Sequence, residues 1–168
     1  MVLWLAVGFP DGMIVLDEPN AGYMTDPMRW PVSPIRTKML LINAQRELNG
    51  EDPVKLAGDK IFRGDAVLFA MFSELQGALP PWMELINSII SPLRVSIEWS
   101  YGKVKYLFKS LSLKMAQRLL AGRPCDDFIL ATFITNCRSC YQWDGPFKKT
   151  FGVEPPSIYD YLDQDEMN

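Results

Sequence analysis

The segment from Ser91 to Lys109 constrains the fold most, because its apolar residues repeat at the spacing of one helical face. Ser91 is a good N-cap, and Pro92 suits the first helical turn, where its missing N–H is no loss. The pattern therefore predicts a helix that begins at Ser91. The residues expected to face a core are Leu93, Ile97, Tyr101, Val104 and Phe108.

Glu98 is the best catalytic candidate in the chain, because it lies in a lane of basic residues next to this apolar face. The other members of the lane are Arg94, Lys105 and Lys109. A carboxylate among cations suits a site that handles phosphates and a metal ion. The alternative is an ion pair between Arg94 and Glu98 on a solvated face, which contributes about 0.2–0.5 kcal/mol.

Length and charge limit the class of protein. A chain of 168 residues with 48% hydrophobic content can bury one ordinary core, so a single domain is the default. The net charge of −3 argues against nucleic-acid binding through bulk electrostatics, although a local basic patch is compatible with it. The sequence has no apolar run of membrane-spanning length and no signal-peptide pattern at its start, which predicts a soluble intracellular protein with no membrane partner.

The cysteine and histidine content restricts the chemistry further. Three cysteines fit a reducing compartment. Cys137 and Cys140 have the spacing of a metal or redox pair, but the chain has no histidine, and Cys125 is the one other cysteine. We therefore expect structural thiols rather than a zinc site. Without histidine the usual Ser-His and Cys-His nucleophiles are excluded, so catalysis must use carboxylates, lysine, tyrosine or a metal.

Turn and cap signals divide the first part of the chain. Apolar runs on both sides of Pro10–Gly12 predict a β-hairpin from Val2 to Leu16. The proline-rich stretch 17–34 is expected to be an irregular connection that presents Asp26 at its tip. A helix over 38–48 should stop at Asn49-Gly50, and a short strand over 54–59 should end at Asp59. An α/β sheet often places a functional carboxylate at that end of a strand, although an aspartate in a turn is the alternative.

The rest of the chain is mostly helical in pattern. The apolar segment 67–90 is expected to be an inserted helical lobe, and Asp126 or Asp127 is expected to cap a helix that includes Phe128–Tyr141. Residues 114–121 should form another helix, and Pro155–Leu162 a short capped helix. The acidic residues 163–168 should form a disordered tail.

Four short motifs follow one another along the chain: Phe9-Pro10-Asp11-Gly12 with Gly22–Asp26, Gly58-Asp59-Lys60-Ile61-Phe62, Val95–Lys105, and Pro155-Pro156-Ser157-Ile158 to Tyr161. In this order they resemble the motifs of the DDE transposase nucleases of the PIF/Harbinger type. Phe62 replaces the tyrosine that the second motif usually has. The resemblance spans nearly the whole chain.

This resemblance implies an α/β, RNase H-like catalytic domain over residues 1–162, with the helical insertion at about 67–90. Asp59 and Glu98 would be catalytic carboxylates that bind Mg²⁺ or Mn²⁺, which prefer hard oxygen ligands. The substrate would be DNA, and the location the nucleus. Lys105, Lys109 and Arg94 would contact DNA phosphates, or else be ordinary solvated cations.

The sequence also departs from the family. The first catalytic aspartate of an RNase H-like domain lies on a strand ahead of the hairpin with which this sequence begins, so we expect that strand and its aspartate to be missing. Two sheet edges would then lack a partner. Asp26 is the one aspartate that we nominate as a substitute. We expect the N-terminal DNA-binding region of full-length transposases to be missing too.

The sequence thus predicts a transposon-derived, metal-dependent endonuclease-like protein that cleaves DNA or transfers its strands, impaired by loss of the first carboxylate. One alternative is a domesticated, non-catalytic domain that binds a partner protein through Met71–Trp82. Another is an unfolded remnant. Metal dependence separates the first two hypotheses, and the DNA target and oligomeric state stay open.

Overall fold

The computed structural model describes residues 2–3, 5–21, 24–73, 78–112, 123–142 and 145–163, and the statements below refer to these residues. The chain divides into two compact units. The first unit comprises Met1–Gly22 and Val95–Asn168, and the second comprises Tyr23–Arg94. The elements are α/β in kind, with three two-stranded sheets in the described part of the chain.

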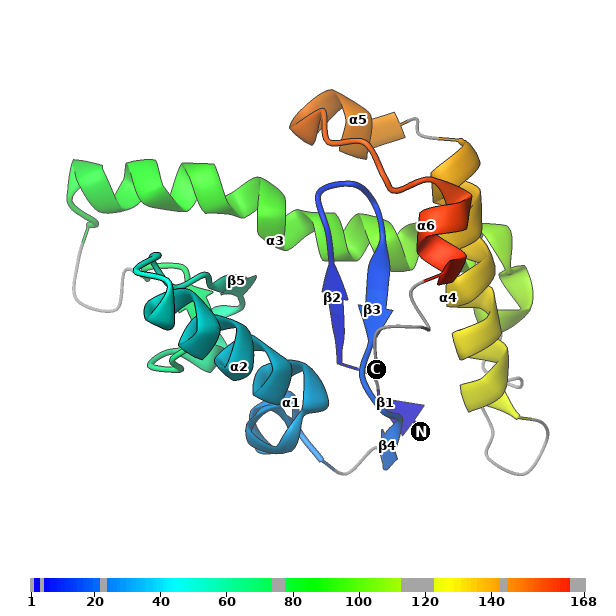
Figure 1. Cartoon of the computed structure of the whole chain (residues 1–168), viewed down its shortest axis with the longest axis horizontal. Helices are drawn as coiled ribbons and strands as arrows, with labels where there is room; N and C mark the ends of the chain where they lie inside the picture. Colours follow the sequence, from blue (N-terminus) through cyan, green and yellow to red (C-terminus); the bar gives the residue numbers. More distant parts are fainter. Residues whose placement is uncertain are drawn as a thin grey trace. The chain divides into compact units, whose positions relative to one another are not determined.

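The first unit contains the predicted hairpin, which is confirmed with a first strand that starts at Ala6 rather than Val2. Strands β2 (Ala6–Gly8) and β3 (Ile14–Leu16) pair antiparallel (Figure 1). In the turn, Asp11 accepts a hydrogen bond from the Met13 N–H at 2.9 Å, and Gly12 has a φ of 85°, which favours glycine. A second antiparallel pair, β1 (Val2–Leu3) with β4 (Asn20–Ala21), was not predicted.

The predicted start of the helix through Glu98 was wrong. Helix α3 runs from Pro81 to Leu107, and Pro92 lies inside it rather than in its first turn. Residues 81–91 are compatible with helix, and Pro81 itself suits a first helical position. The interior proline removes one backbone hydrogen bond, which the turns on both sides tolerate.

The buried face of α3 was predicted in part: Val104 is buried and Phe108 packs against the core, as predicted, but two serines are buried as well. The fully buried residues in its second half are Ser96, Ser100 and Val104, whereas Leu93 is exposed. Small side chains face the core there because Gly8 of the hairpin approaches the helix closely. A Cβ at Gly8 would lie 3.2 Å from the Ser100 hydroxyl oxygen and 3.3 Å from the Ile97 Cα.

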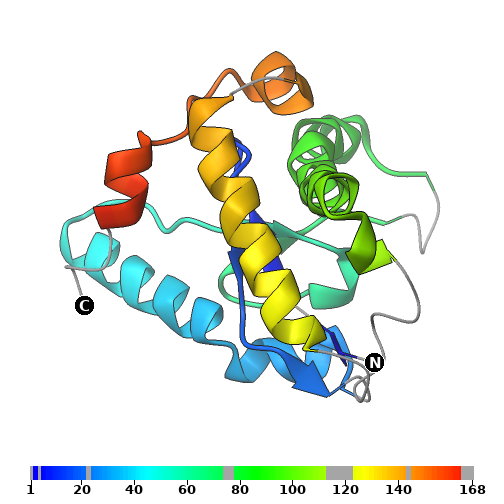
Figure 2. The same ribbon diagram turned by 90° about the vertical axis from the view of Figure 1, so that its right-hand side faces the viewer.

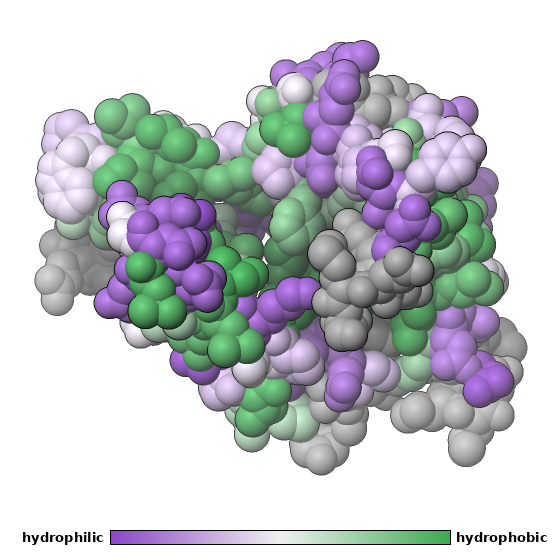
Figure 3. All heavy atoms as spheres, viewed as in Figure 1, coloured by the Kyte–Doolittle hydropathy of each residue, from purple (hydrophilic) through white to green (hydrophobic). Residues whose placement is uncertain are grey.

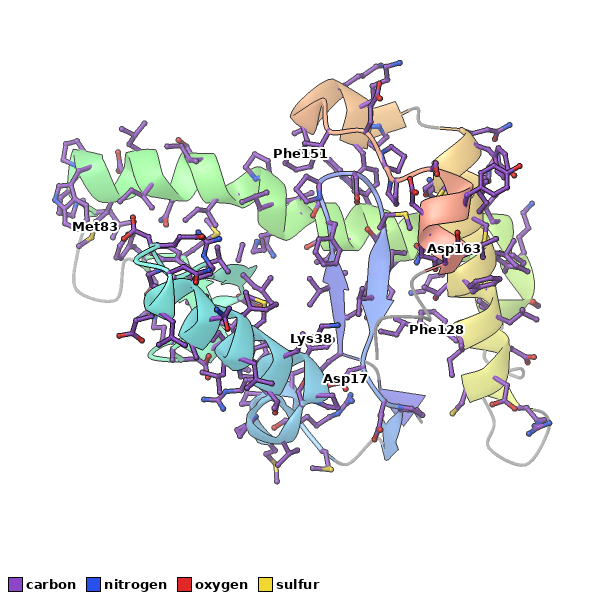
Figure 4. The ribbon with its side chains drawn as sticks, in the orientation of Figure 1. Asp17, Lys38, Met83, Phe128, Phe151 and Asp163 are labelled. Carbon is purple, nitrogen blue, oxygen red and sulfur yellow. The ribbon has the colours of Figure 1, made fainter. Side chains whose placement is uncertain are left out.

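The core of the first unit lies between the hairpin, α3 and α4 (Pro124–Tyr141), as Figures 1 and 2 show. Ile14, Val104 and Ala131 form its buried centre. Phe128 lies on the side of α4 that faces the hairpin (Figure 4) and packs against this cluster. The remaining elements are the 3₁₀ turn η3 (Lys109–Ser112), α5 (Gly145–Phe151) and α6 (Ile158–Leu162).

The caps of the later helices were predicted with mixed success. Arg123 is the N-cap of α4 and Pro124 its first residue, so neither Asp126 nor Asp127 caps the helix. Both aspartates lie in the first turn, where negative charge is favourable. The short C-terminal helix is confirmed, since the Ser157 hydroxyl accepts a hydrogen bond from the Asp160 N–H at 3.1 Å. The helix predicted over 114–121 and the tail from residue 164 lie outside the described residues.

The second unit contains the other predicted strand and helix. Its first elements are α1 (Asp26–Arg29), η1 (Trp30–Val32) and α2 (Pro34–Leu48). Helix α2 begins earlier than predicted, after the N-cap Ser33, and is followed by Gly50 with a φ of 73°. Then come β5 (Leu56–Gly58) and η2 (Lys60–Phe62).

Part of the predicted helical lobe is a strand instead. Strand β6 (Leu68–Ala70) pairs parallel with β5, so that Gly58 lies opposite Ala70. Its three residues form a short apolar run, which periodicity cannot distinguish from buried helix. In the described part of the chain β2 pairs with β3 alone and β5 with β6 alone, so each has one edge without a strand partner.

Three asparagines each bridge both backbone groups of one distant residue. Asn136 of α4 accepts from the Ile14 N–H at 3.0 Å and donates to the Ile14 carbonyl at 2.8 Å. Asn43 bonds Val54 in the same way, and Asn87 bonds Phe72. The side-chain amide replaces a neighbouring strand at each position, because it offers one donor and one acceptor. The first bridge is buried, the one to Phe72 is half-buried and the one to Val54 is exposed.

An ion pair in the second unit makes its stability depend on pH. Asp65 accepts hydrogen bonds from the Arg36 guanidinium and the Val67 N–H, both at 2.9 Å. Burial by itself raises the pKa of Asp65, but these bonds outweigh it and hold the pKa below the usual 3.8. A lowered pKa means that the carboxylate stabilises the fold above its unfolded pKa, and that this contribution is lost as the pH falls through the folded value.

We expect Asp65→Asn to lower the free energy of unfolding by about 1–2 kcal/mol at pH 7, since a hydrogen bond to a charged group is lost. The difference from the parent should shrink below about pH 4, where the parent carboxylate also becomes protonated. Urea melts from pH 7 to pH 2.5 measure this difference. Glu47→Gln, an exposed change on α2, is the control. A difference that is the same at both ends of the pH range contradicts the prediction.

Candidate functional groove around Glu98

Glu98 is exposed because the opposite side of α3 is buried. Ser96 and Ser100 precede and follow it by two positions, and both face the core with 1% exposure. Residues two positions apart on a helix point in nearly opposite directions. The close approach of the hairpin at Gly8 therefore fixes the direction of the Glu98 carboxylate.

A groove of about 460 Å³ runs beside Glu98, entirely within the first unit. Its volume lies in the range of small-molecule and cofactor sites. Cationic and aromatic side chains from α3, α4 and α5 line it together with Glu98. The residues used below are Glu98, Trp99, Lys103, Tyr106, Arg138 and Phe147.

Phe147 anchors one wall of the groove. It is buried, and its ring meets the Trp99 ring edge to face, with centroids 5.7 Å apart. On its other side the ring packs on Gly12 of the hairpin turn, where a Cβ would lie 3.3 Å from it. The chain enters α5 through Gly145, whose φ of 77° favours glycine. These contacts hold the Trp99 ring at the groove wall.

Lys103, which lines the groove, also belongs to a small polar cluster with residues of α4. Its ammonium donates to the Ser139 hydroxyl at 2.8 Å, and that hydroxyl donates to the Thr135 carbonyl at 3.0 Å. Burial raises the pKa of the Cys140 thiol close by, and the adjacent Cys137 raises it further. Cys140 therefore stays a protonated, weakly nucleophilic thiol at neutral pH. Burial also raises the pKa of Asp11, which the Met13 N–H partly offsets.

The groove brings together some of the predicted site residues but not others. Glu98 lines it, whereas Lys105 and Lys109 are exposed and do not. Lys109 lies in η3, beyond the end of α3, so the row of basic residues that was predicted along the helix ends earlier than expected. Arg94 is half-buried and is the last residue of the second unit.

The two predicted aspartates belong to the second unit. Asp59 is exposed and follows β5 directly, as predicted, and its backbone carbonyl accepts the Phe62 N–H at 3.0 Å. Asp26 is also exposed, but it is the first residue of α1 rather than the tip of an irregular loop. Thr25 and Pro27 on either side favour a helix start there.

The described residues contain no group of three or more histidine, cysteine, aspartate or glutamate side chains that could hold a metal ion. Among the residues that the structure describes, Glu98 is the single carboxylate in the lining of the groove. The described part of the chain therefore has no preformed metal site of the kind that a DDE enzyme needs.

Sequence reasoning missed most of the groove. Trp99, Lys103 and Tyr106 recur at helical spacing beside Glu98, so they could have been found from the sequence. Arg138 and Phe147 come from α4 and α5, and nothing in the local pattern links them to Glu98.

No protein-family model, curated protein or solved structure matches the chain. Among the described residues, none of the helices combines the length and the apolar character that crossing a bilayer requires.

Proposed function

We propose that the chain is a transposon-derived, DDE-type endonuclease-like protein that binds DNA and uses divalent metal ions to cleave it or transfer its strands. The observation that supports this proposal best is the groove, in which Glu98 lies with Lys103 and Arg138. Two cations that line one groove favour a phosphate ligand. Asp59, at the end of a strand in a parallel pair, supports an RNase H-like arrangement.

Each side chain has a distinct part in this proposal. Arg138 and Lys103 hold backbone phosphates, and the rings of Trp99 and Tyr106 offer faces on which a base can stack. Glu98 of the first unit and Asp59 of the second are each proposed as a carboxylate that would hold Mg²⁺ or Mn²⁺, and such an ion would supply Lewis-acid chemistry at a phosphate. A DNA substrate implies a nuclear location.

Metal binding is tested by thermal melts with and without Mn²⁺. At about ten times its Kd, Mn²⁺ should add about 1.4 kcal/mol of stability. This corresponds to a rise in Tm of about 3–6 °C for a chain of this size. Asp59→Asn and Glu98→Gln should each reduce the rise. Glu84→Gln, an exposed change on the same helix, should keep it.

If the Tm of the parent does not change with Mn²⁺, the metal-dependent nuclease part of the proposal is wrong. An equal rise in Tm in the Glu98→Gln and Glu84→Gln variants would show that the metal does not bind at Glu98.

DNA binding by the groove is tested separately, without metal. Fluorescence anisotropy with a labelled oligonucleotide should show binding that weakens with salt, because bound phosphates release counterions. Arg138→Gln should reduce the salt slope by about 1, the effect of losing one phosphate contact. Arg63→Gln, an exposed arginine of the second unit, is the matched control. If the salt slope changes equally in both variants, the groove is excluded as the DNA-binding site.

A second candidate function is favoured by an apolar groove of about 720 Å³ in the second unit. Met71, Phe72, Leu79 and Met83 are among the residues that line it. Trp82 beside it is 54% exposed and packs on the Phe72 ring at 5.6 Å. Exposed apolar surface of this kind marks protein-binding sites. This is the segment that the non-catalytic, partner-binding hypothesis requires.

The melts separate the two functions. A partner-binding module should melt cooperatively with a Tm that does not change with Mn²⁺. It should keep its partner binding in the Glu98→Gln variant. It should lose its protein partner on Trp82→Ala but not on Leu48→Ala, an equally apolar truncation on α2.

A further inference from the structure

Helix α4 has its apolar and polar faces reversed relative to an ordinary surface helix. The residues that it buries are small or polar: Ala131, Thr132, Thr135, Asn136 and Ser139, each at most 4% exposed. Its large apolar residues are exposed instead, alongside the charged Asp126, Asp127 and Arg138: Ile129, Leu130, Phe133, Ile134 and Tyr141 are between 42% and 73% exposed. An amphipathic helix in a monomer normally shows the opposite arrangement.

The exposed residues form one continuous face. By helical geometry the five side chains fall within one side of α4, the helix that lies in the foreground of Figure 2. Hydrophobic atoms gather at the right-hand margin of Figure 3, over this helix. We name these five residues the α4 face.

We infer that the α4 face is where two copies of this chain associate, with their α4 helices antiparallel. The inference does not depend on the proposed function. Two observations favour a second copy over another partner, namely the area of the face and the charges at its border.

The area is sufficient for a specific dimer. A large side chain has roughly 200 Å² of accessible surface, so five half-exposed ones present about 500 Å². Two such faces would bury about 1,000 Å² in total, which is the lower limit for a specific protein interface. The expected dimer is therefore weak.

The charges at the border are self-complementary. Asp127 and Arg138 lie on the same side of the α4 face, about three turns apart. An antiparallel pair with its two-fold axis at the level of Thr132 and Phe133 places Asp127 of each copy opposite Arg138 of the other. A two-fold interface repeats every contact, so one charge pair becomes two.

The inference is tested by sedimentation velocity over a wide range of concentration, without DNA or metal. The mass of the parent should rise from 19.1 kDa toward twice that value. Leu130→Glu places a charge in the middle of the face and should give a monomer. Ile42→Glu, an equivalent change of an exposed residue on α2, should leave the dimer intact.

A charge swap tests the antiparallel register. Asp127→Arg and Arg138→Asp should each weaken the dimer by about tenfold or more, because like charges then face each other twice. The double variant should restore it. Circular dichroism confirms that each variant is folded, and recovery in the double variant excludes simple unfolding.

A parent that stays monomeric at every concentration overturns the inference, as does a dimer that survives Leu130→Glu. A folded double variant that fails to recover refutes the antiparallel register. Asp127→Arg leaves every groove residue in place, so loss of the dimer with DNA binding retained separates this inference from the proposed function.

Discussion

Asn136→Ala is expected to lower the free energy of unfolding of the first unit by about 2–5 kcal/mol. The substitution removes the partners of the Ile14 N–H and carbonyl, and Ile14 is 3% exposed. Each of these backbone groups would stay buried without a hydrogen bond, at a cost of about 1–3 kcal/mol. The Tyr161 hydroxyl, 3.1 Å from the same amide nitrogen, would lose a donor as well.

The other two asparagine bridges supply matched controls. Asn43→Ala removes the same two bonds at Val54 but in an exposed position, where water replaces them, so the expected loss is under about 1 kcal/mol. Asn87→Ala, at the half-buried Phe72, should lie between the two. Urea melts of the three variants rank the losses. Equal losses of unfolding free energy in the three variants would contradict the view that the burial of the bridge determines the size of the loss.

Gly8→Val should have the other large effect, a loss of about 3 kcal/mol in the free energy of unfolding. A Cβ alone would lie 3.3 Å from the backbone of Ile97, and valine adds two methyl groups in the same space. Overpacking of this kind typically costs about 1–3 kcal/mol. The loss should reach the upper end because the nearest backbone atom belongs to a helix and cannot shift as a side chain can.

The control for Gly8 is Gly102, a glycine of α3. A Cβ at Gly102 would meet nothing within 4 Å. Gly102→Ala should therefore stabilise the chain by about 0.5–1 kcal/mol, the usual advantage of alanine within a helix. Gly8→Ala, the same substitution in a tight position, should destabilise it. Changes of the same sign in the two alanine variants would mean that the hairpin can move away from α3.

The elements that the sequence predicted correctly are those with strong local signals. The turn at Gly12, the stop at Gly50 and the cap at Ser157 each depend on a few neighbouring residues. The start of α3 was misplaced because Pro92 and Pro81 both suit a first helical turn, and only tertiary contacts decide between them. The strand β6 was missed because a three-residue apolar run has no periodicity.

The candidate site was predictable only in part. Glu98 could be identified because its own helix surrounds it with basic residues. The groove depends on Arg138 and Phe147, which tertiary packing alone brings to it. The reversed α4 face could not be predicted either. Its apolar residues indicate a helix but do not reveal which side the core occupies.

The Asn136 bridge also limits the addition of strands from other chains to the edge of the hairpin. A strand edge with open backbone groups is a template on which other chains can add strands, the first step toward fibrils. At Ile14 of β3 both groups are already bonded to the Asn136 amide, so an incoming strand would have to displace a buried side chain. One asparagine thus protects this edge from aggregation, a task that natural sheets more often give to charged residues or proline.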